Sequence, residues 1–342
     1  MNIETAIKPK VWVLETARMG DNLQAWALAH ALGWETESRQ LRFNLLFAVP
    51  NVALGKSLIS LDEQSSDKLN PPWPDLVIGV GRRTVPIARW IRAQSNGKTK
   101  LVQLGRPRSS NKHFDLVVSS PQYKVAAGNN VLHTMLPIPS TPQPPSRDDQ
   151  AYWNRVLKNY PKPWTGILLG GAKWPFRLNE RVLRDLALRA GQFEGSMLVT
   201  TSPRTIPTAP SIIRNALGKR AFVHMWDGGM LNPHRFILTQ SDRFIVTGDS
   251  ASMLSETCAT GKPVDIYPLP RSKFSKFVET PGNLLSISGL INPPRDMTRL
   301  HQQLIQQGHA VYLGDNPDTS ITWVPDDLTK AVDRVQSMMA HV

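Results

Sequence analysis

The residues best suited to chemistry lie in the second half of the chain, where small hydroxyl residues follow a predicted strand. The strand ends in the run Thr247-Gly248-Asp249-Ser250-Ala251-Ser252-Met253-Leu254-Ser255-Glu256, which continues into a predicted helix. Backbone N–H groups and hydroxyls at a helix N-terminus suit a pyrophosphate. Glu256, further along the same helix, is placed to accept hydrogen bonds from a ribose diol. The alternative is that Asp249 or Ser250 only caps the helix.

Two more loops of this kind follow predicted strands in the same half. They are Gly170-Gly171-Ala172-Lys173 and Thr200-Thr201-Ser202-Pro203-Arg204. Because parallel strands end at one edge of a sheet, the three loops are expected to converge into a phosphate-binding crevice. Arg204 would pair with the diphosphate charge. The candidate nucleotide-sugar residues are Gly171, Ser202, Arg204, Gly248, Asp249, Ser250, Ser252, Met253 and Glu256.

The first half offers two loops for an acceptor or anion. Gly20-Asp21-Asn22-Leu23-Gln24 is predicted between the first strand and the first helix, where Asp21 could act as a general base. A cap formed by Asp21 or Asn22 is the alternative. Gly79-Val80-Gly81-Arg82-Arg83 follows another strand, and its arginines suit a phosphate or carboxylate unless they are only solvated at a tight turn. The candidates here are Asp21 as base and Gly20, Asn22, Gln24, Gly81, Arg82 and Arg83 as contacts.

A basic stretch surrounds the second of these loops. Residues 76–112 contain nine lysines and arginines and no acidic residue, with Asp75 and Asp115 at its borders. With Trp90 in its helix, the segment 87–92 is predicted to lie on an anionic membrane surface. Nucleic acid is not favoured as the partner, because no RNP motif, zinc finger or glycine–arginine repeat is present.

The elements that must position these loops alternate between strand and helix. Apolar strands are predicted at 11–14, 76–81, 100–104 and 115–119 in the first half, and at 166–169, 196–200, 221–225, 243–247 and 263–267 in the second. Helical patterns lie between them, which is typical of parallel sheets covered on both faces. The proline-rich segment 137–145 separates the two halves. We therefore predict two Rossmann-like α/β domains facing a cleft, an acceptor-side domain at 1–140 and a nucleotide-sugar domain at 141–342.

Composition limits the class of protein. The chain has 342 residues, 41% of them hydrophobic, and a formal net charge of +13. The single cysteine, Cys258, excludes a disulfide framework, and the histidines lack metal-ligand spacing, so no metal is expected. The sequence contains no run of about 18 apolar residues. These features favour a cytoplasmic protein with an anionic partner, located either in solution or peripherally on the inner face of the membrane.

A family resemblance attaches to the same motifs. The Gly20–Gln24 loop, the Thr200–Arg204 loop and the Asp249–Glu256 segment resemble the mitochondrial-fission ELM-like family, with similarity from about residue 11 to residue 313. The last motif is also similar to the donor-site helix of GT-B glycosyltransferases. There, the glycine and serine loop holds the nucleotide diphosphate and the glutamate reaches the ribose.

The resemblance implies a metal-independent, inverting transferase that moves a sugar from a nucleotide-activated donor to an envelope glycan or lipid-linked acceptor, without a further cofactor. Asp21 matches the position of the base, with Glu15 as the other candidate. The implied partners are a nucleotide sugar and an anionic lipid or phosphorylated acceptor. The alternative is a non-catalytic adaptor that binds a partner protein or membrane through its basic surface, because plant members of the family are implicated in recruiting a dynamin-type GTPase. A crossover of the last predicted helix, 326–339, back to the first domain is not identifiable from the sequence.

Overall fold

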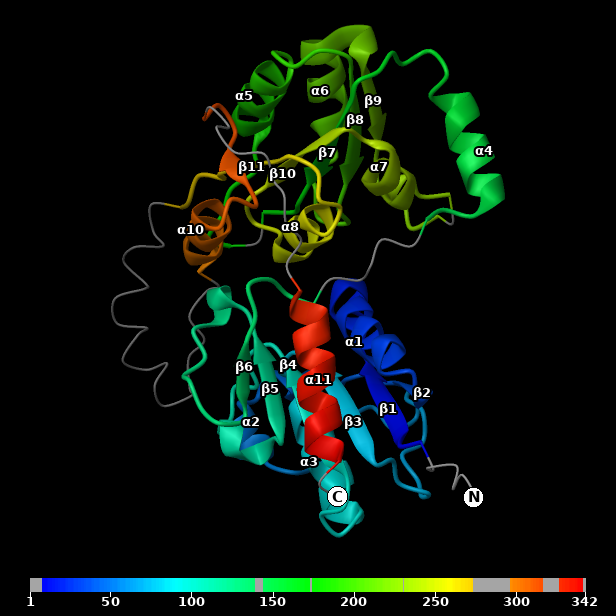
Figure 1. Ribbon diagram of the computed structural model, residues 1–342, viewed down its shortest axis with the longest axis vertical. Coiled ribbons are helices and arrows are strands. Elements are labelled where there is room, and N and C mark those ends of the chain that lie inside the picture. The colour runs from blue at the N-terminus through cyan, green and yellow to red at the C-terminus, as the bar shows by residue number, and fades with distance from the viewer. Residues whose placement is uncertain are drawn as a thin grey trace, which may run out of the picture. The chain divides into compact units, whose positions relative to one another are not determined.

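The computed structural model describes residues 8–138, 144–172, 174–229, 231–272, 296–315 and 326–340. The chain divides into two compact units, each built on its own sheet (Figure 1). Of the described residues, the first unit contains 8–138 and 326–340, and the second contains those between 144 and 315. Both sheets have six strands, and every pair of neighbouring strands is parallel. The prediction of two Rossmann-like α/β domains is confirmed.

The sheet of the first unit has the strand order β2-β1-β3-β4-β5-β6. Its strands are β1 (Lys10–Glu15), β2 (Glu35–Gln40), β3 (Leu76–Val80), β4 (Lys100–Leu104), β5 (Leu116–Ser119) and β6 (Val131–His133). Its α-helices are α1 (Met19–Leu32), α2 (Asn51–Leu54), α3 (Thr84–Gln94) and α11 (Asp327–Met339). The strand order reverses between β1 and β3, which makes the carboxyl ends of these two strands the topological switch point, where open α/β sheets bind ligands.

The core of the first unit follows from the alternation of side chains along buried strands. Val11 and Val13 of β1 pack on one face with α1 and α11, whereas Trp12 and Leu14 pack on the opposite face with α3. Successive residues of a strand point to opposite faces, so a strand that is apolar throughout must be covered on both sides.

Helix α11 belongs to the first unit and packs against α1. The side chain of Asp327 accepts hydrogen bonds from the backbone N–H groups of Met135 and Leu136, each at 2.9 Å. The sequence-based boundary, which placed all of 141–342 in the second domain, is therefore wrong for this helix. Its apolar face is completed by Ala331 and Val335, which fit the α1 side of the first core. Amphipathic spacing predicts the helix but does not identify the sheet that it covers.

The second unit has the strand order β12-β11-β10-β7-β8-β9. Its strands are β7 (Trp164–Leu169), β8 (Ser196–Thr201), β9 (Ala221–His224), β10 (Arg243–Thr247), β11 (Val264–Tyr267) and β12 (Val311–Tyr312). Its helices are α4 (Arg147–Val156), α5 (Glu180–Ala190), α6 (Ala209–Leu217), α7 (His234–Gln240), α8 (Ala251–Cys258) and α10 (Met297–Gln306). The chain builds outward from β7 in one direction and from β10 in the other, so the switch point lies between β7 and β10.

The aliphatic residues of helix α3 face the core of the first unit, so within segment 87–92 they are not available to a membrane surface. Ile87, Ala88 and Ile91 are buried in the core of the first unit. Trp90 is half-buried and packs edge-on against Trp73. The apolar stripe of an amphipathic helix looks the same in sequence when it faces a core and when it faces a bilayer. In this protein the apolar stripe of α3 packs against the core of the first unit.

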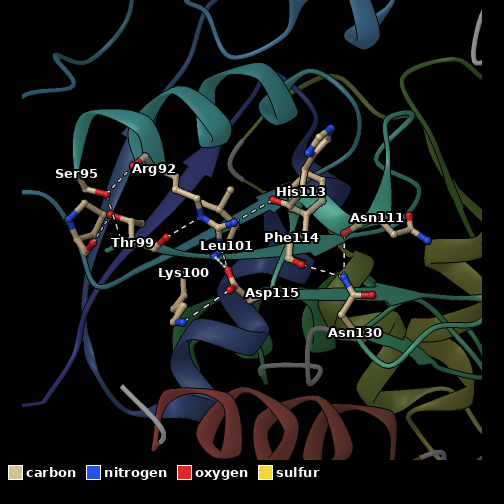
Figure 2. Close-up of polar contacts among 11 residues, drawn as sticks. Arg92, Ser95, Thr99, Lys100, Leu101, Asn111, His113, Phe114, Asp115 and Asn130 are labelled. Atoms are coloured by element: carbon tan, nitrogen blue, oxygen red, sulfur yellow. Dashed lines mark hydrogen bonds and ion pairs between the residues drawn. The ribbon is translucent and has the colours of Figure 1, made fainter. Parts of the chain in front are cut away.

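Charges in the basic stretch are also partly compensated by an acidic residue at its border. Arg92 and Lys100 both pair with Asp115, which also accepts a 2.7 Å hydrogen bond from the Leu101 backbone N–H (Figure 2). The Arg92 guanidinium donates further to the carbonyl oxygens of Thr99 and His113. Arg92 therefore holds the β4–β5 region together, and only part of the stretch presents free positive charge.

Candidate nucleotide and acceptor sites

Two of the predicted phosphate loops meet at the switch point of the second sheet. The backbone N–H of Gly170, after β7, donates to the Thr247 hydroxyl at 2.7 Å, and the N–H of Ala172 donates to Asp249 Oδ2 at 2.7 Å. A Cβ atom on Gly170 would lie 2.3 Å from Asp249 Oδ1. Glycine is therefore required there, because only hydrogen leaves room for the carboxyl group.

Asp249, in the loop after β10, lies where this loop meets the glycine turn after β7. Its Oδ1 is buried and has no hydrogen-bond partner among the described residues. Burial raises the pKa of its carboxyl group, while the hydrogen bonds from Thr247 and Ala172 act in the opposite direction. Asp249 thus fixes the glycine turn after β7, whereas the alternative considered from sequence made it a helix cap.

The third loop, after β8, lies beside the same glycine turn. A Cβ atom on Gly171 would lie 2.1 Å from Arg204 Cβ and 2.9 Å from Arg204 Nε. The hydroxyl of Ser202 lies 3.1 Å from that of Thr205, which in turn donates to the Gly170 carbonyl oxygen at 3.0 Å. The convergence of Gly171, Ser202 and Arg204 expected from sequence is therefore present in the structure.

Helix α8 begins directly after Asp249. Ser250 is its N-cap, and its hydroxyl accepts the Met253 backbone N–H at 3.4 Å. Ser252 and Met253 are half-buried in the first turn. Glu256 follows Ser252 by four residues, so the two side chains share a face of the helix. The Glu256 carboxylate lies 2.7 Å from Nε2 of His234, at the start of α7.

The loop around Gly248 is fixed from behind by α10. Nε2 of His301 lies 2.8 Å from the Gly248 carbonyl oxygen, and a Cβ atom on Gly248 would lie 2.4 Å from the His301 ring. Burial lowers the pKa of His301, so the ring is neutral and donates this hydrogen bond from Nε2. Gly248 therefore has a structural role, because any side chain would displace the histidine.

Sequence reasoning missed Trp226, which follows β9 at the same edge of the sheet. The residue is 41% exposed, and its backbone N–H donates to the Thr201 hydroxyl at 2.8 Å. Thr201 immediately precedes Ser202, so Trp226 flanks the phosphate loops. The sequence reasoning also missed His234 as the partner of Glu256. Extending the strand-end argument from β7, β8 and β10 to β9 would have found Trp226.

In the first unit, Asp21 and the arginine loop lie at the switch point between β1 and β3. The glycine-bearing turn expected at residues 20–22 is instead the first turn of α1, which begins at Met19. Asp21 Oδ2 lies 3.7 Å from the Arg18 guanidinium and 3.5 Å from the position of a Cβ atom on Gly81. Gly81 has a φ of 72°, which favours glycine. The carboxylate is thus held beside the loop after β3.

Arg18, Arg82 and Arg83 form a positive cluster, in which Arg18 and Arg83 interact with this carboxylate. Burial lowers the pKa of both Arg82 and Arg83, and the Arg18 charge lowers both further. For Arg83, Asp21 acts in the opposite direction. The Arg83 guanidinium stacks on Phe47, with its carbon 3.9 Å from the ring centre. Positive charges that lower one another's pKa in a part-buried site are relieved by an anion.

The amides of the first predicted loop are engaged with the main chain. Asn22 Oδ1 accepts the Thr16 N–H at 3.0 Å, its Nδ2 donates to the Thr16 carbonyl oxygen at 2.8 Å, and Gln24 donates to the Gly20 carbonyl oxygen at 3.2 Å. Glu15 accepts hydrogen bonds from Trp26 and Gln40 through its two oxygens. Because Glu15 is occupied in this way, Asp21 is the stronger candidate base.

The described residues contain neither a metal-binding cluster nor a membrane-spanning helix. No group of three or more His, Cys, Asp and Glu side chains that could hold a metal ion occurs among them. None of the helices in the described ranges has the length and apolarity to cross a membrane.

Comparison with known proteins identifies the family. The family model described as Mitochondrial fission ELM1 matches residues 19–293. The chain belongs to this family. Among its relatives, the mitochondrial fission protein ELM1 of Arabidopsis thaliana is 29% identical over an alignment that covers 75% of this chain and 69% of that protein.

Solved structures reveal the same fold in proteins of other families. The UDP-GlcNAc 2-epimerase of Methanocaldococcus jannaschii matches with a TM-score of 0.51 at 11% identity, covering 97% of this chain and 100% of that chain. Arabidopsis thaliana UGT89C1, complexed with UDP-L-rhamnose, matches with a TM-score of 0.50 at 13% identity, covering 95% of this chain and 88% of that chain. This ELM1-family chain therefore shares the GT-B-like fold, with two Rossmann-like units, that is expected from the donor-site motif.

Proposed function

We propose that this member of the ELM1 family is a GT-B-like glycosyltransferase that binds a nucleotide-activated sugar on its second unit. The observation that carries the proposal is the convergence of three loops on the β7–β10 switch point, with Arg204 beside the glycine turn. The fold supports it, since UGT89C1 has been solved with UDP-L-rhamnose bound.

In this proposal residues of all three loops contribute to binding the donor. Gly171, Ser202, Arg204, Ser250 and Ser252 bind the diphosphate through N–H groups, hydroxyls and the guanidinium. Asp249 and Gly248 hold the loops in place. Met253 and Glu256 lie toward the ribose, and His234 orients the Glu256 carboxylate. Trp226 offers a face on which a nucleobase can stack.

The reaction is a single displacement. Asp21 takes the proton from the acceptor hydroxyl, whose oxygen bonds to the anomeric carbon as the bond from that carbon to the diphosphate oxygen breaks. Arg204 and the N-terminal N–H groups of α8 stabilise the negative charge that develops on the nucleoside diphosphate. The arginine cluster at Arg82 and Arg83 selects an anionic acceptor, either a lipid-linked or a phosphorylated glycan, and the mechanism includes no cofactor.

The first test is binding of UDP, CMP and GDP to the full chain by isothermal titration calorimetry. One of them is expected to bind, and Arg204→Ala is expected to weaken that binding by about 10- to 100-fold, the effect of losing a hydrogen bond to a charged group. Arg184→Ala is the matched control, because Arg184 is exposed and pairs only with Glu180 among the described residues. If none of the three nucleotides binds, the transferase proposal fails and a non-catalytic adaptor of the same family is favoured.

A further inference from the structure

The connection between β2 and β3 exposes a concentration of aliphatic side chains. Among the described residues nine large hydrophobic side chains are exposed, and four of them fall within 45–59. Leu45 is 88% exposed, Val52 66% and Ile59 61%, and Leu46 accompanies them. Exposed aliphatic residues gathered in one short segment mark an interaction surface. We call residues 44–60 the apolar loop.

The apolar loop is held in shape by two asparagines. Asn44 accepts the Leu46 N–H at 2.9 Å and donates to the Ile59 carbonyl oxygen at 2.8 Å, which brings Leu45 and Ile59 close together. Asn51 donates to the carbonyl oxygens of Arg82 and Pro107, at 2.9 and 2.8 Å. These bonds support the backbone while leaving the aliphatic side chains in solvent.

Positive charge borders the same loop. Arg82 donates to the Val49 carbonyl oxygen at 3.3 Å, and the Arg83 guanidinium stacks on Phe47. Arg42 and Lys56 are exposed on the loop and next to it. No acidic residue occurs between positions 38 and 61 or in the basic stretch 76–112 that contains the two arginines. The apolar loop therefore combines exposed aliphatic side chains with positive charge nearby.

We propose that the apolar loop docks the first unit onto an anionic lipid surface. Leu45, Val52 and Ile59 enter the boundary between head groups and acyl chains, while Arg42 and Lys56 contact anionic head groups. Charge complementarity selects this occupant, since aliphatic residues alone would suit any apolar partner. The surface differs from segment 87–92, whose aliphatic side chains are buried, and the proposal does not depend on nucleotide binding.

The test is flotation of the full chain with vesicles of phosphatidylcholine alone or with about one third phosphatidylglycerol, compositions that separate the electrostatic from the apolar contribution. The wild-type chain is expected to float with the anionic vesicles and to be released by salt. Leu45→Ser/Ile59→Ser is expected to weaken this binding about tenfold or more, because two apolar insertions are lost. Leu188→Ser is the matched control, since Leu188 is 66% exposed in the second unit.

Three results would overturn the proposal. The wild-type chain would fail to bind anionic vesicles, the double variant would bind them as well as the wild type, or the control would lose as much binding as the double variant. Sedimentation of the chain without lipid could give a fourth such result, in which the wild type is a dimer and Leu45→Ser/Ile59→Ser is a monomer. That result would mean that a second copy of the chain covers the loop. Nucleotide titration of the double variant should match the wild type, which separates this test from that of the transferase.

Discussion

At the scale of single residues, Asp21 is the group on which the proposed chemistry depends most directly. Its carboxylate lies between Arg18 and the loop at Gly81, at the switch point of the first sheet. We expect Asp21→Asn to lower sugar transfer by about 10²- to 10⁴-fold, the usual contribution of a general base. Nucleotide affinity should stay unchanged, because we propose that the nucleotide binds on the other unit.

Glycosyl transfer and calorimetry on the same preparations check this prediction. Glu15→Gln is the matched control, since it alters the rival carboxylate and leaves Asp21 in place. Equal loss of transfer in both variants would assign the base elsewhere.

A second prediction at this scale concerns Gly171. A Cβ atom there would lie 2.1 Å from Arg204 Cβ, closer than carbon atoms approach in folded proteins. Gly171→Ala must therefore displace the Arg204 loop, and we expect nucleotide affinity to fall by about tenfold or more as the guanidinium leaves the diphosphate.

Calorimetry with the nucleotide that the wild type binds gives the measurement. Gly218→Ala is a control for glycine loss in the same unit, because a Cβ atom at Gly218 would meet no atom within 4 Å. Its positive φ makes that control mildly destabilising but leaves the site intact. Unchanged affinity in Gly171→Ala would remove the loop after β7 from the site.

At the scale of elements, the phosphate loop after β10 depends on α10 through His301. Burial lowers the pKa of His301 below that of the unfolded chain. The unfolded state therefore binds the proton more readily, and stability is lost as the pH falls below about 6.5, the unperturbed value. His224, whose pKa burial also lowers, adds to the loss in the same direction.

Urea unfolding at pH 7.5 and pH 5.5 measures this effect. His301→Gln retains a donor for the Gly248 carbonyl oxygen and cannot become charged, so its stability should fall less than that of the wild type between the two values. An equal fall in both proteins would mean that His301 does not titrate with folding.

At the scale of the whole molecule, the chain returns to its first unit after completing the second. Helix α11 packs on α1, and Asp327 accepts the N–H groups of Met135 and Leu136, almost two hundred residues earlier. Asp327→Ala leaves two backbone donors, one buried and one part-buried, without this partner. We expect it to destabilise the first unit by about 2–3 kcal/mol.

Urea unfolding of the full chain reports this loss, and nucleotide affinity should be unaffected. Asp333→Ala, an exposed change on the same helix, is the control and should alter stability by less than about 0.5 kcal/mol. If Asp327→Ala lowered the free energy of unfolding no more than Asp333→Ala does, α11 would contribute little to the stability of the first unit.

The sequence by itself determined most strands of the two sheets and the loops that end them. Buried parallel strands must be apolar throughout, and glycines and small hydroxyl residues after them are visible as breaks in that pattern. The positions of Asp21, the Arg82–Arg83 pair and the three loops at strand ends could therefore be predicted, and with them the fold, whereas their binding roles stay proposals. Each of these features is defined by residues that lie close together in the sequence.

Only the tertiary structure decided which distant elements complete these local units. The roles of Asp249 and His301 depend on contacts with Ala172 and Gly248 from other strands. The apolar residues of α3 face a core, and α11 covers the first sheet although it follows the second. The physical reason is that the hydrophobic effect is non-directional, so an apolar stripe records that it must be buried without recording against what.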